Sequence, residues 1–208
     1  MHVTLRARRE ASFLRAETVF AAVRRAFGRA QREDFGIVHF SVQGNHVHLL
    51  VEAKDRAALG SGMQGLTTRL ARAINGALRR SGRVWADRYH RRDLGSPREV
   101  RHALVYVLQN HAKHGADTSL GHGAEHLRLD PKSSAVYFPG WTSRAGPALA
   151  RLRALERARD RELASERDAA EPRHPSAPVC APSGWLLTEG WRLGGAIDPA
   201  ERPRPEAS

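Results

Sequence analysis

The sequence is poor in cysteine and has no long apolar run. Cys180 is the single cysteine among 208 residues, so neither a disulfide framework nor a zinc site built from cysteines can form. No stretch approaches the roughly 18 apolar residues that a membrane-spanning helix needs. The first ten residues are basic and polar, which is unlike a signal peptide. We therefore expect a cytoplasmic protein with no membrane partner.

Acidic residues are scarce in the first half of the chain. Residues 1–115 hold 21 of the 34 basic residues but only 9 of the 22 acidic ones, so this half carries the whole net charge of +12. A basic half beside a neutral half favours a polyanionic partner such as nucleic acid. The alternative explanation of the positive charge is that the protein comes from a proteome rich in arginine, because nearly all of these cations are Arg.

Apolar periodicity predicts seven elements in the first half. In chain order they are a strand at 2–6, a helix at 16–30, two strands within 36–51, a helix at 56–80, a strand at 84–94 and a helix from 96 to about 113. The first six match a ferredoxin-like βαββαβ fold, an antiparallel sheet with two helices on one face. The predicted class is therefore α+β, with an extra C-terminal helix that carries Tyr106.

The turn Gly44-Asn45 sets the register of a predicted hairpin. On the mostly polar face, the expected pairs are Gln43 with His46, Ser41 with His48 and His39 with Leu50. On the apolar face, which can receive the two helices, they are Val42 with Val47, Phe40 with Leu49 and Val38 with Val51.

His46 and His48 share one face of this hairpin, because side chains alternate along a strand. Two imidazoles so placed can bind one cation, and a mixed nitrogen and oxygen site suits Mg²⁺ or Mn²⁺. Glu52 lies further along the same face and is a further candidate ligand. The alternative is a polar surface strand without a metal.

The helix that begins at Ser96 has a polar stripe around Tyr106. Ser96 is the expected N-cap, with Pro97 in the first turn and Glu99 completing a capping box. Tyr106 lies between His102 and Asn110 at steps of four residues, so the three side chains touch one surface patch. A phenol has a pKa of about 10 and is a weak nucleophile at neutral pH, but a nearby divalent cation would activate the phosphate it attacks. The alternative for Tyr106 is packing against the sheet.

Together these residues resemble the single-tyrosine HUH transposases, the insertion-sequence 200-like group, and within it the REP-associated tyrosine transposases. The matching segments are His2–Arg6 (HVTLR), Val38–Glu52 (VHFSVQGNHVHLLVE), Asp87–His90 (DRYH) and Leu104–Gly115 (LVYVLQNHAKHG). The resemblance implies metal-dependent cleavage and transfer of single-stranded, hairpin-bearing DNA through a 5′-phosphotyrosine. By position, His46 and His48 match the metal pair, Tyr106 matches the nucleophile, and Asn110 occupies the place of the third ligand.

The resemblance covers residues 1–140 and divides the chain. We expect a HUH transposase-like catalytic domain at 1–140, a charged helical extension at 141–170 and a proline-rich, flexible tail at 171–208. Trp185 and Trp191 interrupt this tail and are expected to dock on another surface, which the sequence does not identify. Relatives often have Asn-Pro where this chain has Asn110-His111, which concerns the helix end and not the chemistry.

DNA contacts are expected from basic and aromatic residues on the second predicted helix, the fourth strand and the tyrosine helix. These are Arg69, Arg72, Arg79, Arg80, Arg83, Arg88, Tyr89, His90, Arg91, Arg92 and Lys113. A non-catalytic or domesticated protein that only binds hairpin or single-stranded nucleic acid is the main alternative function. A zinc-binding interaction protein is disfavoured because cysteine ligands are lacking. Both a monomer and a homodimer remain open.

Overall fold

The computed structural model describes residues 1–110, 129–165 and 177–203. Its strands are β1 (His2–Arg6), β2 (Phe35–Val42), β3 (His46–Ala53) and β4 (His90–Arg92). Its α-helices are α1 (Glu17–Gly28), α2 (Arg56–Ala77), α3 (Pro97–Gln109), α4 (Gly146–Ser165) and α5 (Trp185–Thr188). Short 3₁₀ turns are η1 (Arg9–Ala11), η3 (Ser134–Tyr137), η4 (Ser143–Ala145) and η5 (Gly190–Gly194). Within these ranges, no helix has both the length and the apolar character to span a bilayer.

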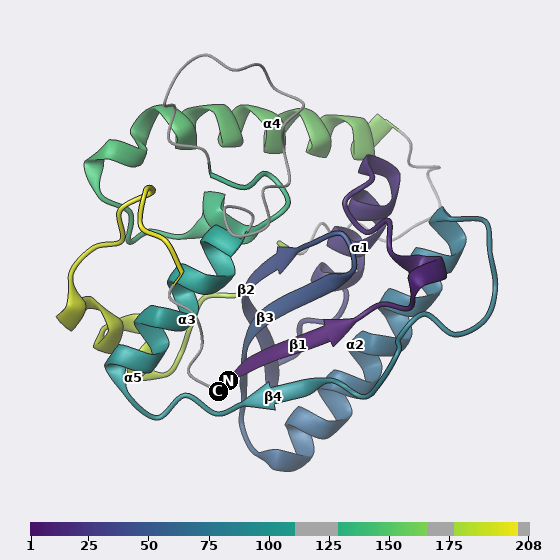
Figure 1. The fold of residues 1–208 in the computed structure, drawn as a ribbon, viewed down its shortest axis with the longest axis horizontal. Coiled ribbons are helices and arrows are strands. Elements are labelled where there is room, and N and C mark those ends of the chain that lie inside the picture. The colour runs from purple at the N-terminus through teal and green to yellow at the C-terminus, as the bar shows by residue number, and fades with distance from the viewer. Residues whose placement is uncertain (111–128, 166–176, 204–208) are drawn as a thin grey trace.

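The four strands form one antiparallel sheet in the order β2-β3-β1-β4 (Figure 1). Together with the chain order strand, helix, strand, strand, helix, strand, this is the ferredoxin-like arrangement. The predicted α+β class and its βαββαβ topology are confirmed. Helix α3 follows the fourth strand, carries Tyr106, and is succeeded by α4 and α5.

Each face of the sheet packs against different helices. On one face, Val3, Leu5 and Leu49 share an apolar core with side chains of α1 and α2, including the fully buried Phe20 and Leu66. The opposite face, to which the hairpin histidines belong, packs against α3 through a second apolar cluster. As predicted, α1 and α2 cover the apolar face of the hairpin. The mostly polar face is also covered, so most of its side chains are buried.

The hairpin register is confirmed near the turn and wrong at its far end. Ser41 pairs with His48 and Phe40 pairs with Leu49, as expected. A register shift between Ile37 and His39 then makes Ile37, and not Val38, the partner of Val51. The extra residue in β2 is a bulge, which alternation alone cannot reveal. It places Val38 in the cluster beside α3.

Strand β4 and helix α2 are shorter than predicted. The fourth strand was expected at 84–94, but only residues 90–92 pair with β1, and the earlier part forms a single bridge between Trp85 and Ala7. Helix α2 ends at Ala77, just before Arg79 adopts a positive φ of 50°. A residue in this left-handed region cannot continue a helix, so the helix stops before the predicted residue 80.

The start of α3 is as predicted. The Ser96 side chain accepts a hydrogen bond from the Glu99 backbone N–H, and Pro97 occupies the first turn. Glu99 reaches back to accept from the Gly95 backbone N–H and the Ser96 hydroxyl. The described helix ends at Gln109, and its predicted continuation to Lys113 lies outside the described residues.

The second half of the chain packs around α3 and α1. In Figure 1, α4 runs along the top of the molecule and α5 lies beside α3. Trp191, 2% exposed, packs against Phe138 with ring centroids 5.1 Å apart, and η5 lies against α3. Arg101 of α3 donates two hydrogen bonds to the Glu201 carboxylate, at 2.5 and 2.9 Å. Residues 185–201 are thus fastened to the tyrosine helix, while the Trp185 side chain is 58% exposed.

Candidate active site

Tyr106 and His48 meet on the face of the sheet that α3 covers. Their ring centroids are 5.1 Å apart, and the rings are nearly perpendicular at 87°. His46 stacks on His48 from the same strand, with centroids 6.1 Å apart and ring planes 15° apart. Alternation along β3 puts both imidazoles on one face, and the packing of α3 on that face brings the phenol to them. The predicted nucleophile and the predicted metal pair are therefore neighbours within one chain.

One nitrogen of each hairpin imidazole lies against an oxygen atom. The His48 Nδ1 is 3.2 Å from the Thr4 hydroxyl of β1, and the His46 Nδ1 is 2.7 Å from the Asn45 side-chain oxygen. Imidazoles that bind metals commonly engage an oxygen atom through the second ring nitrogen, which fixes the ring orientation. In such an arrangement, Nε2 is the ring nitrogen that would bind a cation.

His2 is a third imidazole in this row, and the sequence prediction did not include it among the site residues. Its ring lies 5.6 Å from that of His48 and 5.5 Å from that of Tyr106, centroid to centroid. His2 is 7% exposed and packs against both rings. The alternation of β1 put His2 and Thr4 on one side of the strand. Only the pairing of β1 with β3 reveals that this is the side of His48.

Asn110 is a buried amide that no described residue hydrogen-bonds. It caps the C-terminal end of α3, one turn beyond Tyr106, and is 0% exposed. In the part of the chain that the structure describes, neither its side-chain nitrogen nor its oxygen has a partner, a rare condition that calls for a functional explanation. An amide oxygen and two imidazole nitrogens form a donor set that divalent cations accept. The residues present therefore fit a metal.

The described residues contain no cluster of three or more His, Cys, Asp or Glu that could hold a metal. A cation at the histidine pair would thus depend on the Asn110 amide and on oxygen atoms of the substrate. Glu52 is not available for this purpose, because its carboxylate accepts hydrogen bonds from the backbone N–H groups of Ser183 and Gly184, at 2.7 and 2.9 Å. Glu52 therefore holds the C-terminal segment in place.

The two other tyrosines have different surroundings. Tyr137 accepts a hydrogen bond from Arg24 and donates one to Glu156. Burial, together with the nearby Glu156 carboxylate, raises the pKa of Tyr137 to about 12, which keeps this phenol protonated. Tyr89 is half-buried against the apolar core that α1 and α2 share. Among the three tyrosines, Tyr106 is the one that lies against the hairpin histidines.

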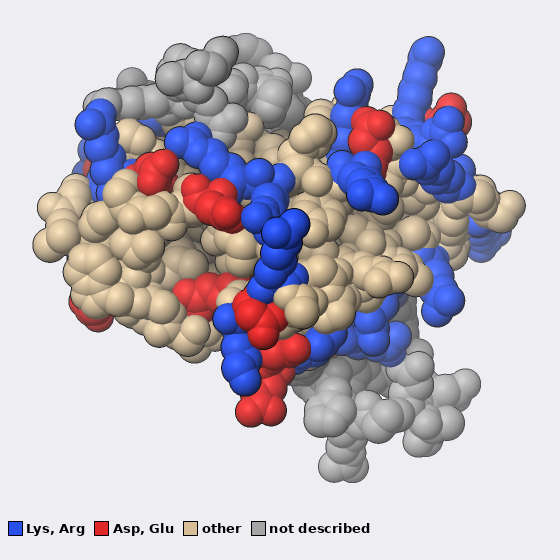
Figure 2. Space-filling view, turned by 90° about the horizontal axis from the view of Figure 1, so that it is seen from below, with Lys and Arg blue, Asp and Glu red and all other residues tan. Residues whose placement is uncertain are grey.

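The predicted DNA contacts fall on different surfaces. His90 and Arg92 of β4 pair with Thr4 and His2, so they share the sheet face of Tyr106, whereas Arg91 points to the opposite face. Basic side chains cover more of the surface than acidic ones on the face seen from below (Figure 2). The remaining arginines that are exposed are Arg69, Arg72, Arg79, Arg83 and Arg88, while Arg80 and Tyr89 are half-buried. Lys113 lies outside the described residues.

Comparison with known proteins agrees with this arrangement. The model of the family described as "Transposase IS200 like" matches residues 1–110. This range includes both hairpin histidines, Tyr106 and Asn110. No curated protein and no solved structure matches the chain. Since the match spans more than half of the sequence and the fold is that of a four-stranded α+β domain, the chain belongs to the IS200-like transposases, DNA-binding enzymes that cleave DNA.

Proposed function

We propose that the chain cleaves and rejoins one strand of hairpin-bearing DNA, with Tyr106 as the nucleophile. The phenol gives up its proton to water as its oxygen attacks the phosphorus. The new bond is a 5′-phosphotyrosine, and the bond from phosphorus to the 3′ oxygen breaks. The 3′ oxygen leaves as a hydroxyl after taking up a proton, so the linkage is stored on the protein. Attack by another 3′-hydroxyl reverses these steps and transfers the strand.

One observation carries this proposal: the Tyr106 ring lies 5.1 Å from that of His48, beside a second histidine. His46, His48 and Asn110 would hold the divalent cation, Mg²⁺ or Mn²⁺. When bound, such a cation polarises the scissile phosphate and stabilises the departing oxygen. The buried Asn110 amide supports this assignment, because its oxygen binds no donor within residues 1–110, 129–165 and 177–203 and is therefore suited to a metal.

The chain's own residues orient the reacting groups. His2 packs against both His48 and Tyr106, and we assign it a positioning role, holding the phenol over the hairpin. His90 and Arg92 are exposed on the same sheet face, where they would bind the phosphates that flank the cleaved one. The single strand would therefore run across β1 and β4 toward Tyr106.

Trapping the covalent intermediate tests the proposal. The protein is incubated with end-labelled single strands and Mn²⁺, denatured, and separated by electrophoresis. We expect a labelled adduct that Tyr106→Phe abolishes and Tyr89→Phe retains, since Phe keeps the ring packing and removes only the hydroxyl. His46→Ala should abolish the adduct but leave most of the DNA affinity. An adduct that persists in Tyr106→Phe would refute the assignment, and absence of an adduct with every hairpin substrate would favour a protein that only binds DNA.

A further inference from the structure

A pocket lies between β2, the turn η3 and residues 177–192. Its volume is about 520 Å³, within the range of about 300–1,000 Å³ that is typical of sites for small molecules. Most of its lining side chains are apolar, among them Val38, Phe138, Pro139, Val179, Leu187 and Trp191. The residues assigned to the reaction are not among those that line it. The pocket is therefore separate from the candidate active site, and its walls suit a ligand with an apolar body.

Aromatic rings form part of the wall. The ring centroids of Phe138 and Trp191 are 5.1 Å apart, and the His39 ring meets the Phe138 ring edge-on, with centroids 5.5 Å apart. All three side chains line the pocket and are largely buried, with exposed fractions of 2–6%. Rings held in this way offer faces and edges against which another flat ring packs favourably. This wall favours a planar aromatic ligand.

His39 supplies a hydrogen-bond acceptor at the pocket. Its Nδ1 lies 3.1 Å from the Ser134 hydroxyl. That hydroxyl accepts a hydrogen bond from the Phe40 backbone N–H and donates its one proton to the Phe40 carbonyl oxygen, at 2.9 and 3.3 Å. Nδ1 therefore carries the proton of the contact with Ser134, and Nε2 has the free lone pair, a tautomer assigned from this network. Ser134 does not line the pocket, so the ring turns its opposite edge, with Nε2, toward the cavity.

The acceptor on His39 lacks a donor. Within the described ranges, the hydrogen bond of this imidazole is the one at Nδ1, which leaves Nε2 without a partner. Burial lowers the pKa of His39 to about 4, so the ring stays neutral and Nε2 keeps its lone pair at neutral pH. A buried acceptor without a partner costs free energy, which a ligand that donates a hydrogen bond would recover. The ligand is therefore expected to carry an N–H or O–H group.

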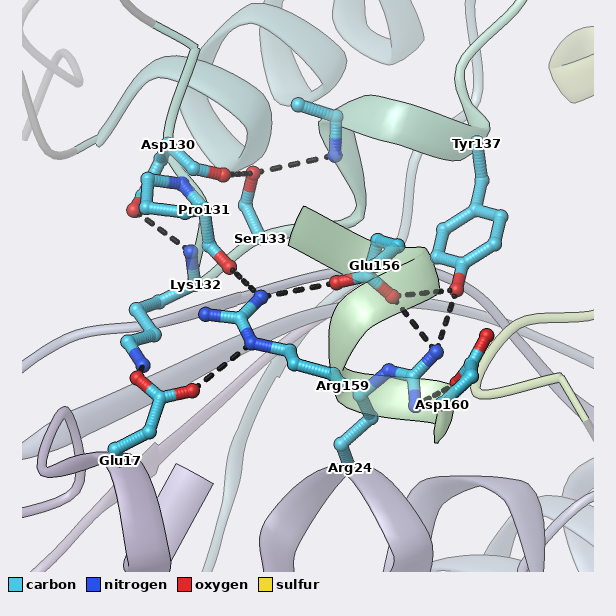
Figure 3. Close-up of polar contacts among 11 residues, drawn as sticks. Glu17, Arg24, Asp130, Pro131, Lys132, Ser133, Tyr137, Glu156, Arg159 and Asp160 are labelled. Atoms are coloured by element: carbon cyan, nitrogen blue, oxygen red, sulfur yellow. Dashed lines mark hydrogen bonds and ion pairs between the residues drawn. The ribbon is translucent and has the colours of Figure 1, made fainter. Parts of the chain in front are cut away.

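The other polar groups at the pocket are already engaged. The Tyr137 hydroxyl accepts a hydrogen bond from Arg24 and donates one to Glu156, so it points away into the network that fastens α4 to α1 (Figure 3). Glu189 and Arg192 form an ion pair at 3.7 Å, and the Arg192 guanidinium lies over the Trp191 ring. Their opposite charges add no net charge to the lining, which favours an uncharged ligand.

We propose that this pocket binds an uncharged, planar aromatic molecule that donates a hydrogen bond from a ring N–H or O–H to Nε2 of His39. The ring of the ligand would pack against Phe138 and Trp191. The inference does not rest on the proposed reaction, because the pocket uses none of the reacting groups. Its C-terminal wall also lies beyond residue 110, where the family match ends. A ligand held between β2 and residues 177–192 would fasten this segment to the sheet.

A matched pair of probes tests the role of His39. Fluoroindole has a ring N–H, and its N-methyl derivative lacks this donor but has the same rings. Dissociation constants are measured by fluorine NMR on the full chain. Cys180 provides a second readout, because this single cysteine of the chain is half-buried and lines the pocket, so that a ligand should protect it from alkylation.

Three variants complete the design. His39→Phe keeps a flat ring and removes the acceptor. Ala181→Trp fills the pocket from an exposed lining position, and the matched control Ala154→Trp places the same side chain on an exposed position of α4 outside the pocket. Melting temperatures verify that each variant is folded.

Fluoroindole should bind wild type with a Kd of about 1 mM, and the N-methyl derivative should bind about 10-fold more weakly because it leaves Nε2 unpaired. At a fluoroindole concentration twice its Kd, the alkylation rate of Cys180 should fall about 3-fold. His39→Phe should bind the two probes equally. Ala181→Trp should bind fluoroindole at least about 10-fold more weakly, whereas Ala154→Trp should behave as wild type.

Several results would overturn the proposal. They are undetectable binding of fluoroindole, equal affinity of wild type for both probes, binding without protection of Cys180, and wild-type affinity in Ala181→Trp. Tighter binding of a fluoroindole carboxylate would contradict the preference for an uncharged ligand. If His39→Phe does not fold, the ratio of the two probes on wild type and the two tryptophan variants still decide the question. Tyr106→Phe should bind fluoroindole as wild type does, so the pocket and the proposed reaction are tested separately.

Discussion

We predict that the protein becomes more stable when Asn110, whose buried amide has no partner among the described residues, is replaced by an apolar residue. A buried polar group without a partner costs about 1–3 kcal/mol relative to one that is paired or absent. Both polar atoms of Asn110 lack a partner among the residues that the structure describes, and the side chain is 0% exposed. Leucine has a similar branched shape and no polar atoms. Asn110→Leu should therefore raise the free energy of unfolding of the metal-free protein.

The expected gain is about 1–3 kcal/mol. In a chain of this size, it corresponds to an increase in melting temperature of roughly 2–12 °C. The matched control is Gln109→Leu. The neighbouring Gln109 is also buried, but its side-chain nitrogen donates a 2.8 Å hydrogen bond to the Asp198 carbonyl oxygen. Loss of a satisfied amide should lower the stability by about 1 kcal/mol, so the two variants should shift in opposite directions.

Mn²⁺ should reverse the order of stability. A ligand that binds only the folded protein adds about 4.1 kcal/mol at a concentration about 1,000 times its Kd, which exceeds the gain of about 1–3 kcal/mol expected for Asn110→Leu. Wild type should gain this stability through His46, His48 and Asn110, whereas Asn110→Leu should gain much less. Thermal melts with EDTA and with increasing Mn²⁺ measure both effects without requiring any cleavage.

Two outcomes would refute the reasoning. If Asn110→Leu is less stable than wild type in EDTA while Gln109→Leu behaves as expected, the amide does not carry an unsatisfied cost. If Mn²⁺ stabilises wild type and Asn110→Leu equally, Asn110 is not a ligand. Asn110→Asp separates the cost of burying a polar group from its role as a metal ligand. A buried carboxylate should destabilise the metal-free protein, but Mn²⁺ should stabilise this variant strongly.

Other predictions concern the scaffold around the site. In urea denaturation, Gly62→Ala should lower the free energy of unfolding by about 1–3 kcal/mol, because a Cβ there would lie 2.3 Å from the Phe35 ring. The control is Gly60→Ala in the same helix, where a Cβ meets nothing within 4 Å and the free energy of unfolding should rise by up to about 1 kcal/mol. Burial lowers the pKa of His39 to about 4, from 6.5 when unfolded. The unfolded chain therefore binds the proton more readily, and the stability present above pH 6.5 should fall by about 3 kcal/mol as the pH drops to 4, an effect that His39→Gln should remove from denaturation curves. Trp191→Ala should lower the free energy of unfolding by about 3–5 kcal/mol and slow adduct formation, because α3 loses packing. An unchanged rate of adduct formation would show that the C-terminal packing does not support the site.

Local signals made much of the fold predictable. Gly44-Asn45 fixed the hairpin turn, and alternation from there placed His46 and His48 on one face. Ser96, Pro97 and Glu99 marked the start of α3, and the apolar periodicity of α1 and α2 matched one face of the sheet. In each case, the residues that decide the structure are neighbours in the sequence, so a single window contains the information.

Features that depend on distant residues were not predictable in this way. The bulge between Ile37 and His39 changes one pair of the hairpin without changing the hydrophobic pattern. The place of His2 depends on the pairing of β1 with β3. The packing of Trp191 against Phe138 joins segments more than fifty residues apart. The sequence near each of these residues gives no indication of its partner.

The close approach of Tyr106 to His48 within one polypeptide has a consequence for stoichiometry. If the proposed reaction is correct, a single copy carries both the attacking hydroxyl and the imidazoles that serve it, and turnover per molecule should not fall on dilution. Donation of the tyrosine to a second copy would first require α3 to separate from residues 185–201, including the Arg101–Glu201 ion pair. Cutting one DNA end and joining another would then be successive events at the same hydroxyl.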